Sequence, residues 1–332
     1  MHYVSWVSNR RHWIPIARCC STSSRNQPVT TPSPIILTRR DGGALVRATI
    51  SPVGASLQGL SVAGVELVRG SLDATPVESS GITLVPWPNR VRAARWEWKG
   101  QEQALLPTEA GTANALHGLL AATDYAIARH SEGAVLLTAR IDNAPGYPFA
   151  LDVSVEYHLA ADGIRVSLSV HNRGGELAPV GLGAHPYLRL GDTPAAELTL
   201  SVPAERALLL TQDHLPAAMV SVAGTPLDLR EGRRVTESPA HLGFTALRAE
   251  SGAVTSTLSG PMGRAELWMD PRFRWLQIYL TREFPGLADD QLAIAVEPMT
   301  APPDALNSGI DLHLIAPADT WSLDWGIRFV PA

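Results

Sequence analysis

The chain has few charged residues and no long apolar run, and each shortage excludes a class of partner. Charged residues make up 18% of the 332 residues, and the formal net charge is −5. The body of the chain has no cluster of Lys or Arg, which argues against a nucleic-acid partner. No apolar run approaches the roughly 18–20 residues that a membrane-spanning helix needs. We expect a soluble, cytoplasmic protein with no membrane partner, either a monomer or a dimer.

Acidic residues are missing from the first 40 positions, where six arginines and many Ser and Thr residues lie. The only two cysteines, Cys19 and Cys20, are adjacent in this region and make poor disulfide partners for one another. This composition is typical of an organelle transit peptide, and a mis-assigned start codon also produces it. We predict that residues 1–33 are a disordered or dispensable extension and that residues 34–332 form a single domain.

The body of the chain also lacks the common signatures of metal, cofactor and hydrolase sites. It has no His-x-His, His-Glu-x-x-His or paired-Cys motif, so the sequence predicts no metal site. No Gly-rich phosphate loop precedes a helix, so we expect no nucleotide cofactor. A nucleophile elbow of the Ser-His-Asp hydrolases is missing as well. The sequence therefore predicts chemistry without a cofactor.

Alternating apolar and polar residues are abundant from Ile35 onward. In 151–159 every odd position is apolar, Asp162-Gly163 supplies a turn signal, and 164–171 alternates again. This pattern predicts a β-hairpin with one face in water. Further strands are predicted at 44–50, 95–99, 197–202, 253–258, 264–269, 275–280, 291–296 and 321–329. Since no amphipathic helix exceeds about three turns, we predict an all-β fold, a large antiparallel β-sandwich.

One carboxylate has an unusual position. The apolar run from Leu292 to Val296 leads directly to Glu297, and Pro298 follows. A glutamate at the end of a buried strand is held rigidly and partly shielded from water, which raises its pKa toward the range of a general base. The alternative is that Glu297 is simply the first exposed residue after a strand, because acidic residues are mostly exposed.

Three further segments contain residues suited to a ligand. His117 precedes Gly118, which permits close backbone approach, and His185 follows a run of small residues and precedes Pro186. A residue before proline is restricted to extended conformations, so His185 should be fixed in direction. The small residues before it should leave room for a ligand. Trp87 lies between two prolines before Asn89 and Arg90, and we interpret it as an aromatic platform for a polyhydroxylated ligand.

Four segments in this order resemble the aldose 1-epimerase (galactose mutarotase) family, and the resemblance extends over about residues 35–330. They are 86–90 (PWPNR), 114–118 (NALHG), 183–187 (GAHPY) and 296–305 (VEPMTAPPDA). The resemblance implies a large antiparallel β-sandwich that interconverts the α and β anomers of a free aldose. It also implies that Glu297 is the base and His185 the acid. The sugar-binding residues would be Asn89, Arg90, His117, Tyr187, Gln277 and His241.

One position departs from the family pattern. Many members have a sugar-binding Asp where this chain has His241, and Asp228 is the substitute if the alignment slips. The first rival function is a hexose-6-phosphate epimerase of the same fold, with Arg92, Arg95 and Arg189 as the candidate phosphate ligands. The second rival is a carbohydrate-binding protein without turnover. Binding alone needs no acid–base pair, so the presence of both His185 and Glu297 argues against it.

Overall fold

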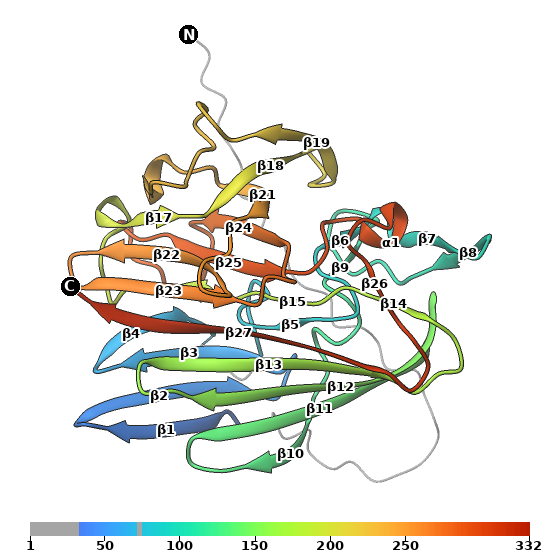
Figure 1. Ribbon diagram of the computed structural model, residues 1–332, viewed down its shortest axis with the longest axis horizontal. Helices are drawn as coiled ribbons and strands as arrows, with labels where there is room; N and C mark the ends of the chain where they lie inside the picture. Colours follow the sequence, from blue (N-terminus) through green and yellow to red (C-terminus); the bar gives the residue numbers. More distant parts are fainter. Residues whose placement is uncertain (1–32, 72–74) are drawn as a thin grey trace.

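Two large sheets make up most of the computed structural model, which describes residues 33–71 and 75–332 (Figure 1). Neighbouring strands are antiparallel throughout both sheets. The prediction of a large antiparallel β-sandwich is therefore confirmed. The predicted extension at 1–33 lies almost wholly outside the described residues, so the domain boundary stays a prediction.

The first sheet has 12 strands, and two of the sequence motifs described above, 183–187 and 296–305, lie partly in its strands. Ten strands form its main path, and two short ones lie off it. In spatial order the strands are β1 (Ile35–Asp41), β2 (Ala44–Ser51), β3 (Ser56–Val62), β4 (Val65–Arg69), β16 (Tyr187–Leu188), β25 (Ala293–Met299), β24 (Trp275–Thr281), β21 (His241–Leu247), β18 (Ala204–Leu210) and β19 (Pro216–Ser221). The short strands β15 (Gly183–Ala184) and β5 (Thr83–Leu84) pair beside β25.

The second sheet has nine strands and packs against the first (Figure 1). In spatial order it contains β10 (Ala126–His130), β11 (Ala134–Ala144), β12 (Tyr147–Leu159), β13 (Gly163–Asn172), β27 (Thr320–Pro331), β23 (Gly263–Met269), β22 (Val254–Gly260), β17 (Thr199–Ser201) and β20 (Arg233–Arg234). The predicted hairpin is β12 and β13, and the inward residues of β12 alternate with less buried ones as the period of two requires.

Short elements complete the fold. They are the pairs β6 (Arg90–Val91) with β9 (Ala115–Leu116), β7 (Arg95–Trp98) with β8 (Gln101–Ala104) and β14 (Ala178–Val180) with β26 (His313–Ile315), three 3₁₀ turns (Arg92–Ala94, Ala195–Glu197, Val235–Glu237) and α1 (Ala305–Ser308). In the described range, α1 is the only α-helix, and no helix is long or apolar enough to cross a membrane. The strand predicted at 197–202 is shorter than expected, because a 3₁₀ turn occupies Glu197.

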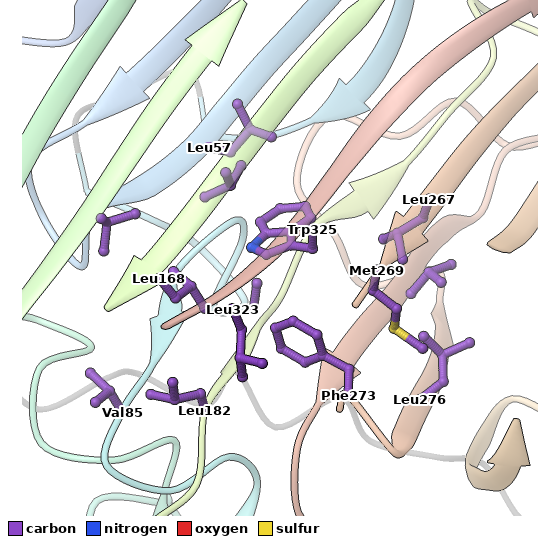
Figure 2. Packing of buried hydrophobic residues seen from close by; sticks show 14 of the residues in the cluster. Leu57, Val85, Leu168, Leu182, Leu267, Met269, Phe273, Leu276, Leu323 and Trp325 are labelled. Carbon is purple, nitrogen blue, oxygen red and sulfur yellow. The ribbon is translucent and has the colours of Figure 1, made fainter. Parts of the chain in front are cut away.

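The hydrophobic core lies between the two sheets. Leu57 and Leu276 come from the first sheet, whereas Leu168, Leu267 and Trp325 come from the second, and all are at most 2% exposed (Figure 2). Side chains from both inner faces thus belong to one cluster, as expected of a sandwich. This core holds the central strands of the first sheet, β24 and β25, in place.

Strand β25 differs from its prediction at both ends. It starts at Ala293 and continues through Glu297 and Pro298 to Met299, so Glu297 lies inside the strand and not at its end. The N–H groups of Val296 and Thr300 donate to the carbonyls of Pro186 and Leu182. Position 298 falls between them, opposite Ala184 of β15, so the proline removes a single hydrogen bond from this side of the strand.

Candidate active site

One row across the first sheet places the two predicted catalytic residues side by side. Gly183 on β15 pairs with Met299, and Tyr187 on β16 pairs with Ala295. The same register sets His185, which links β15 to β16, opposite Glu297. His185 Nε2 is 3.4 Å from Glu297 Oε1. The register of the sheet therefore brings the predicted acid and base together.

The row continues on the far side of β25. Gln277 pairs with Glu297, and Gly243 on β21 pairs with Gln277. Two residues further along each strand, on the same face, lie Tyr187, Ala295, Tyr279 and His241. The predicted sugar-binding residues Tyr187, Gln277 and His241 thus gather in two adjacent rows around the acid–base pair.

The opposite face of these strands faces the core. Val296 and Ile278 alternate with the site residues and belong to the main hydrophobic cluster. On the site face, two small apolar clusters flank the polar row. One contains Tyr187, Phe284 and Ala295, and the other contains Leu208, Trp275 and Met299.

The backbone of His185 is bonded on both sides. Its N–H donates to the carbonyl of Ile82 at 3.1 Å, and its carbonyl accepts from the N–H of Gly81 at 2.8 Å. The predicted fixed direction of His185 agrees with these bonds. The small residues before it, however, serve packing. A Cβ on Gly181 or Gly183 would lie 2.8 Å from the Pro88 ring or 2.9 Å from the Pro298 carbonyl, so they leave room for neighbouring motifs, not for a ligand.

A second loop brings His117 to the pair. Its ring meets that of His185 edge-on, with centroids 5.2 Å apart. The backbone N–H of Asn89 donates to the ring Nδ1 of His117 at 3.3 Å. The backbone N–H of His117 donates in turn to the backbone carbonyl of Asn89 at 2.8 Å. Gly118 follows with φ +81°, and a Cβ there would lie 2.0 Å from the Val85 carbonyl oxygen. The predicted close backbone approach at Gly118 is confirmed.

Burial controls the protonation of this group. Glu297 is 2% exposed, and desolvation raises its pKa to about 8 although the charge of Arg90 acts in the opposite direction. Desolvation lowers the pKa of His185 to about 4 and that of His117 well below its usual value. The predicted rise in the pKa of Glu297 is confirmed. The sequence predicts a carboxylate base beside a protonated imidazole acid, whereas burial favours the neutral forms of both.

Several buried polar atoms in the site lack a protein partner. Within the described part of the chain, no hydrogen bond reaches Glu297 Oε2, His185 Nδ1 or Gln277 Oε1. Buried polar groups are nearly always hydrogen-bonded in proteins, and exceptions concentrate where function requires them. A polyhydroxylated ligand, whose hydroxyls both donate and accept, could satisfy these atoms.

The two histidines and the glutamate also have the composition of a catalytic zinc site. Their ligand atoms lie within 4.8 Å of one another, although no sequence motif indicated such a cluster. A metal-bound histidine normally donates its second N–H to an acceptor. Here His117 Nδ1 accepts a hydrogen bond instead, which leaves the proton of the neutral ring on Nε2, the atom that would have to bind the metal. The surroundings therefore suit hydrogen bonding and proton transfer better than metal binding.

Arg90 stands at the edge of the site. Its guanidinium binds the carboxylate of Glu109, and its N–H groups also donate to the side-chain oxygen of Asn89. The positive charge of Arg90 is a smaller cause than desolvation at each neighbouring group. It offsets part of the rise in the pKa of Glu297 and adds to the fall in the pKa of His185. At His117 it adds to the fall caused by desolvation and by His185. All the predicted site residues are therefore close together, with Arg90 as their cationic member.

The structure corrects one aromatic prediction and gives the surroundings of another. Trp87 is 1% exposed and packs near Tyr147 in the core, so it is not a stacking platform for a ligand. Tyr187 is fully buried, and its hydroxyl donates to the Glu78 carbonyl at 3.0 Å. Its ring lies 5.2 Å from that of His185. These contacts pack Tyr187 beside His185, and its predicted role in sugar binding stays a prediction.

The departure at His241 is located within the site. His241 lies beside Tyr279 on the next strand, and its ring centroid is 4.3 Å from that of His214. Desolvation, followed by the neighbouring His214, lowers the pKa of His241 to about 3. Asp228, the alternative, is engaged in an ion pair with Arg230. Tyr279, His214 and Glu109 lie near these residues but were not predicted, since none of them belongs to a recognisable motif.

Comparison with family models identifies the family of the chain. The family model of aldose 1-epimerase matches residues 37–328. The chain belongs to the aldose 1-epimerase family. Among its relatives is YihR, an uncharacterized protein of Escherichia coli K12, which is 32% identical over 270 residues, 81% of this chain and 85% of YihR.

Solved structures of epimerase-like proteins share the fold. A putative aldose 1-epimerase of Escherichia coli K12 gives a TM-score of 0.73 at 22% identity, covering 90% of this chain and 100% of the other. A GalM/aldose epimerase homologue of Caenorhabditis elegans gives 0.76 at 18% identity, with 90% and 100% covered. Galactose 1-epimerase of Lactobacillus acidophilus gives 0.74 at 20% identity, with 93% and 97% covered. At these identities the likeness shows the fold alone.

Proposed function

We propose that the protein is an aldose 1-epimerase that interconverts the α and β anomers of a free aldose. The observation that carries the proposal is the buried pair of His185 Nε2 and Glu297 Oε1, 3.4 Å apart, beside buried polar atoms of Glu297, His185 and Gln277 that lack a hydrogen-bond partner. Ring opening needs one group to take the proton from the anomeric hydroxyl and another to protonate the ring oxygen. Two groups that hold one proton between them can do both.

The reaction follows from the carboxylate and imidazolium forms of the pair. Glu297 takes the proton of the anomeric O1–H, the C1–O5 bond breaks, and His185 gives its proton to O5. The product is the open-chain aldehyde with a C5 hydroxyl. Rotation about C1–C2 presents the other carbonyl face, and closure returns a proton from O5 to one group while the other protonates O1. His117, with its proton on Nε2, and Arg90 donate hydrogen bonds to sugar oxygens.

Replacing Glu297 tests the base. We expect Glu297→Gln to fold normally and to lose at least about 10²-fold in the rate of mutarotation, since a positioned proton-transfer group contributes about 10²–10⁴-fold. The measurement is polarimetry on freshly dissolved α-D-glucose and α-D-galactose. The matched control is Glu102→Gln, a surface glutamate paired with Arg95. A Glu297→Gln rate near that of the wild type would contradict the assignment.

The pH dependence of kcat/KM tests the shared proton. Between the pKa of His185, about 4, and that of Glu297, about 8, the pair holds one proton, and its two neutral groups interconvert with the ion pair. A second proton binds below this window, and none is left above it. We therefore expect a plateau that falls on both sides, measured by polarimetry across the pH range. A single titration on one side only would argue against the pair.

The sugar preference remains to be measured, because His241 replaces an acceptor of the family pattern. Histidine lacks the two acceptor oxygens that a vicinal diol prefers. We expect a panel of free aldoses to differ in kcat/KM, with His241→Asp changing the order of preference. Acceleration of no aldose, alongside measurable sugar binding, would favour the non-catalytic carbohydrate-binding protein instead.

The phosphosugar alternative has less support. Each of its candidate phosphate ligands is already paired with a carboxylate: Arg92 with Asp304, Arg95 with Glu102 and Arg189 with Asp192. A phosphate would have to displace these acids. Turnover of glucose 6-phosphate well above that of glucose would reverse this ranking.

A further inference from the structure

Glu109 binds Arg90 along one edge of the guanidinium. The Nε–H of Arg90 lies 2.9 and 3.1 Å from the two carboxylate oxygens, and one terminal nitrogen lies 2.6 Å from Oε1. Both side chains are largely buried, with exposed fractions of 11% and 14%. A fork of this kind fixes orientation as well as distance.

The carboxylate is itself held in place. Its second oxygen accepts from the hydroxyl of Thr112 at 2.9 Å and from the amide of Asn114 at 3.2 Å. The side-chain oxygen of Asn114 accepts from the N–H of Ala93 at 3.0 Å, next to β6. Arg90 pairs with Leu116 across β6 and β9. The loop that carries Glu109 is therefore tied to the strand that carries Arg90.

The fork also determines which donors Arg90 offers to a ligand. A guanidinium has five N–H donors. Two bind Glu109, and a third binds the Asn89 side chain at 3.3 Å. The remaining donors are on the terminal nitrogens. The positive charge of the guanidinium also acts, after desolvation, to lower the pKa values of Glu297, His185 and His241.

We infer that Glu109 is a positioning residue, which aims the guanidinium of Arg90 at the sugar oxygens and partly neutralises its charge next to Glu297. This inference rests on the proposed function. The rival explanation is that Glu109 merely anchors its loop. The two differ in outcome, because an anchor would not change the ionisation of Glu297.

The first readout needs no sugar. We would follow the side-chain carboxyl of Glu297 by ¹³C NMR as a function of pH, identifying its signal by its loss in Glu297→Gln. The charged or titratable groups around Glu297 are Arg90, His117, His185 and Tyr187. In Glu109→Gln the charge of Arg90 is no longer offset, so Glu297 should titrate at a pH lower by at least about half a unit. Glu109→Asp should restore much of the shift.

The second readout is kinetic. Glu109→Gln should raise KM and lower kcat/KM about 10–100-fold, because misaligned donors cost that much. The alkaline limb of the pH profile of kcat/KM for Glu109→Gln should move to lower pH together with the NMR titration of Glu297. Glu102→Gln, the same change in a surface ion pair, should alter neither. A Glu297 titration at higher pH would contradict the neutralising role of Glu109, since it would require Arg90 to act less on Glu297 once Glu109 is removed.

An unchanged titration and an unchanged KM in Glu109→Gln would overturn the inference. A general loss of folding would move Tm and the whole spectrum, so Tm is measured on every variant, and only variants that remain folded are compared. If the wild type accelerates no aldose, the proposed function fails. The NMR titration still decides the role of Glu109 in that case.

Discussion

Glu297 and His185 are 2% and 5% exposed, and desolvation raises the pKa of Glu297 and lowers that of His185. Desolvation would destabilise an ion pair of these two side chains, and it leaves them sharing one proton between their two pKa values. At the residue scale, therefore, burial is what makes an ordinary Glu and His suited to acid–base work near neutral pH. In the proposed function, His117, Gln277 and Arg90 orient the sugar around this pair.

This burial has a consequence for stability. Because the folded-state pKa of Glu297 is raised to about 8, its contribution to stability is complete below its unfolded value of about 4.3 and is lost as pH rises toward 8. Gln at this position has no such loss. We expect Glu297→Gln to gain stability relative to wild type as pH rises from about 4.5 to 8.

The measurement is the free energy of unfolding in urea at several pH values for both proteins. Glu102→Gln is the control, since the Glu102 side chain is 68% exposed. A difference between Glu297→Gln and wild type that stays constant with pH would contradict the pKa assigned to Glu297. This test is independent of whether any sugar is turned over.

At the element scale, the site depends on register, and register is what the sequence could not supply. The motifs identified His185 and Glu297 as candidates, but their opposition arises from the pairing of β15 and β16 with β25. Two-residue strands such as β15 have no period to detect. Gln277 entered through the family resemblance, and its place beside Glu297 also follows from register alone.

The glycines show the same limit. Gly181 and Gly183 were interpreted as space for a ligand, whereas they admit Pro88 and Pro298 of two other motifs. Contacts between distant segments cannot be deduced from the small size of a residue. Gly118 was interpreted correctly because close backbone approach is a local property of glycine.

Gly118 allows a matched test of close approach against backbone conformation. Gly118 and Gly252 have φ values of +81° and +85°, but a Cβ would meet the Val85 carbonyl only in the first case and nothing within 4 Å in the second. Gly252→Ala should cost about 1–2 kcal/mol for the left-handed conformation alone. Gly118→Ala should cost at least about 3 kcal/mol and lower activity, since His117 must move.

Urea unfolding and polarimetry on the two variants provide the measurements. Equal losses of stability would show that the approach of Gly118 to Val85 relaxes at little cost. The comparison separates conformational strain from steric overlap because the two glycines share the same φ region.

At the scale of the whole molecule, the fold class was predictable because half-exposed hairpins such as β12 and β13 alternate cleanly. Strands in other environments carry a weaker signal. Strand β10 is exposed along its whole length, so it lacks an apolar face, whereas every residue of β25 is buried, so its true end at Met299 was not apparent. Side-chain periodicity reports a difference between two faces, and it fails where both faces are alike.

The last prediction concerns the start of the fold. Strand β1 begins at Ile35 and pairs with β2 along its full length, and its inward Ile35 and Leu37 are 6% and 0% exposed. We expect removal of residues 1–33 to leave Tm within about 2 °C of that of the full chain and activity unchanged, because the buried side chains of Ile35 and Leu37 remain. Removal of residues 1–41 should cost at least about 3 kcal/mol, since each buried aliphatic side chain contributes about 1.5–3 kcal/mol. The longer deletion would also expose the edge of β2. Thermal unfolding and polarimetry on both truncations decide the point, and a large fall in Tm for the shorter one would place the N-terminal segment within the stable fold.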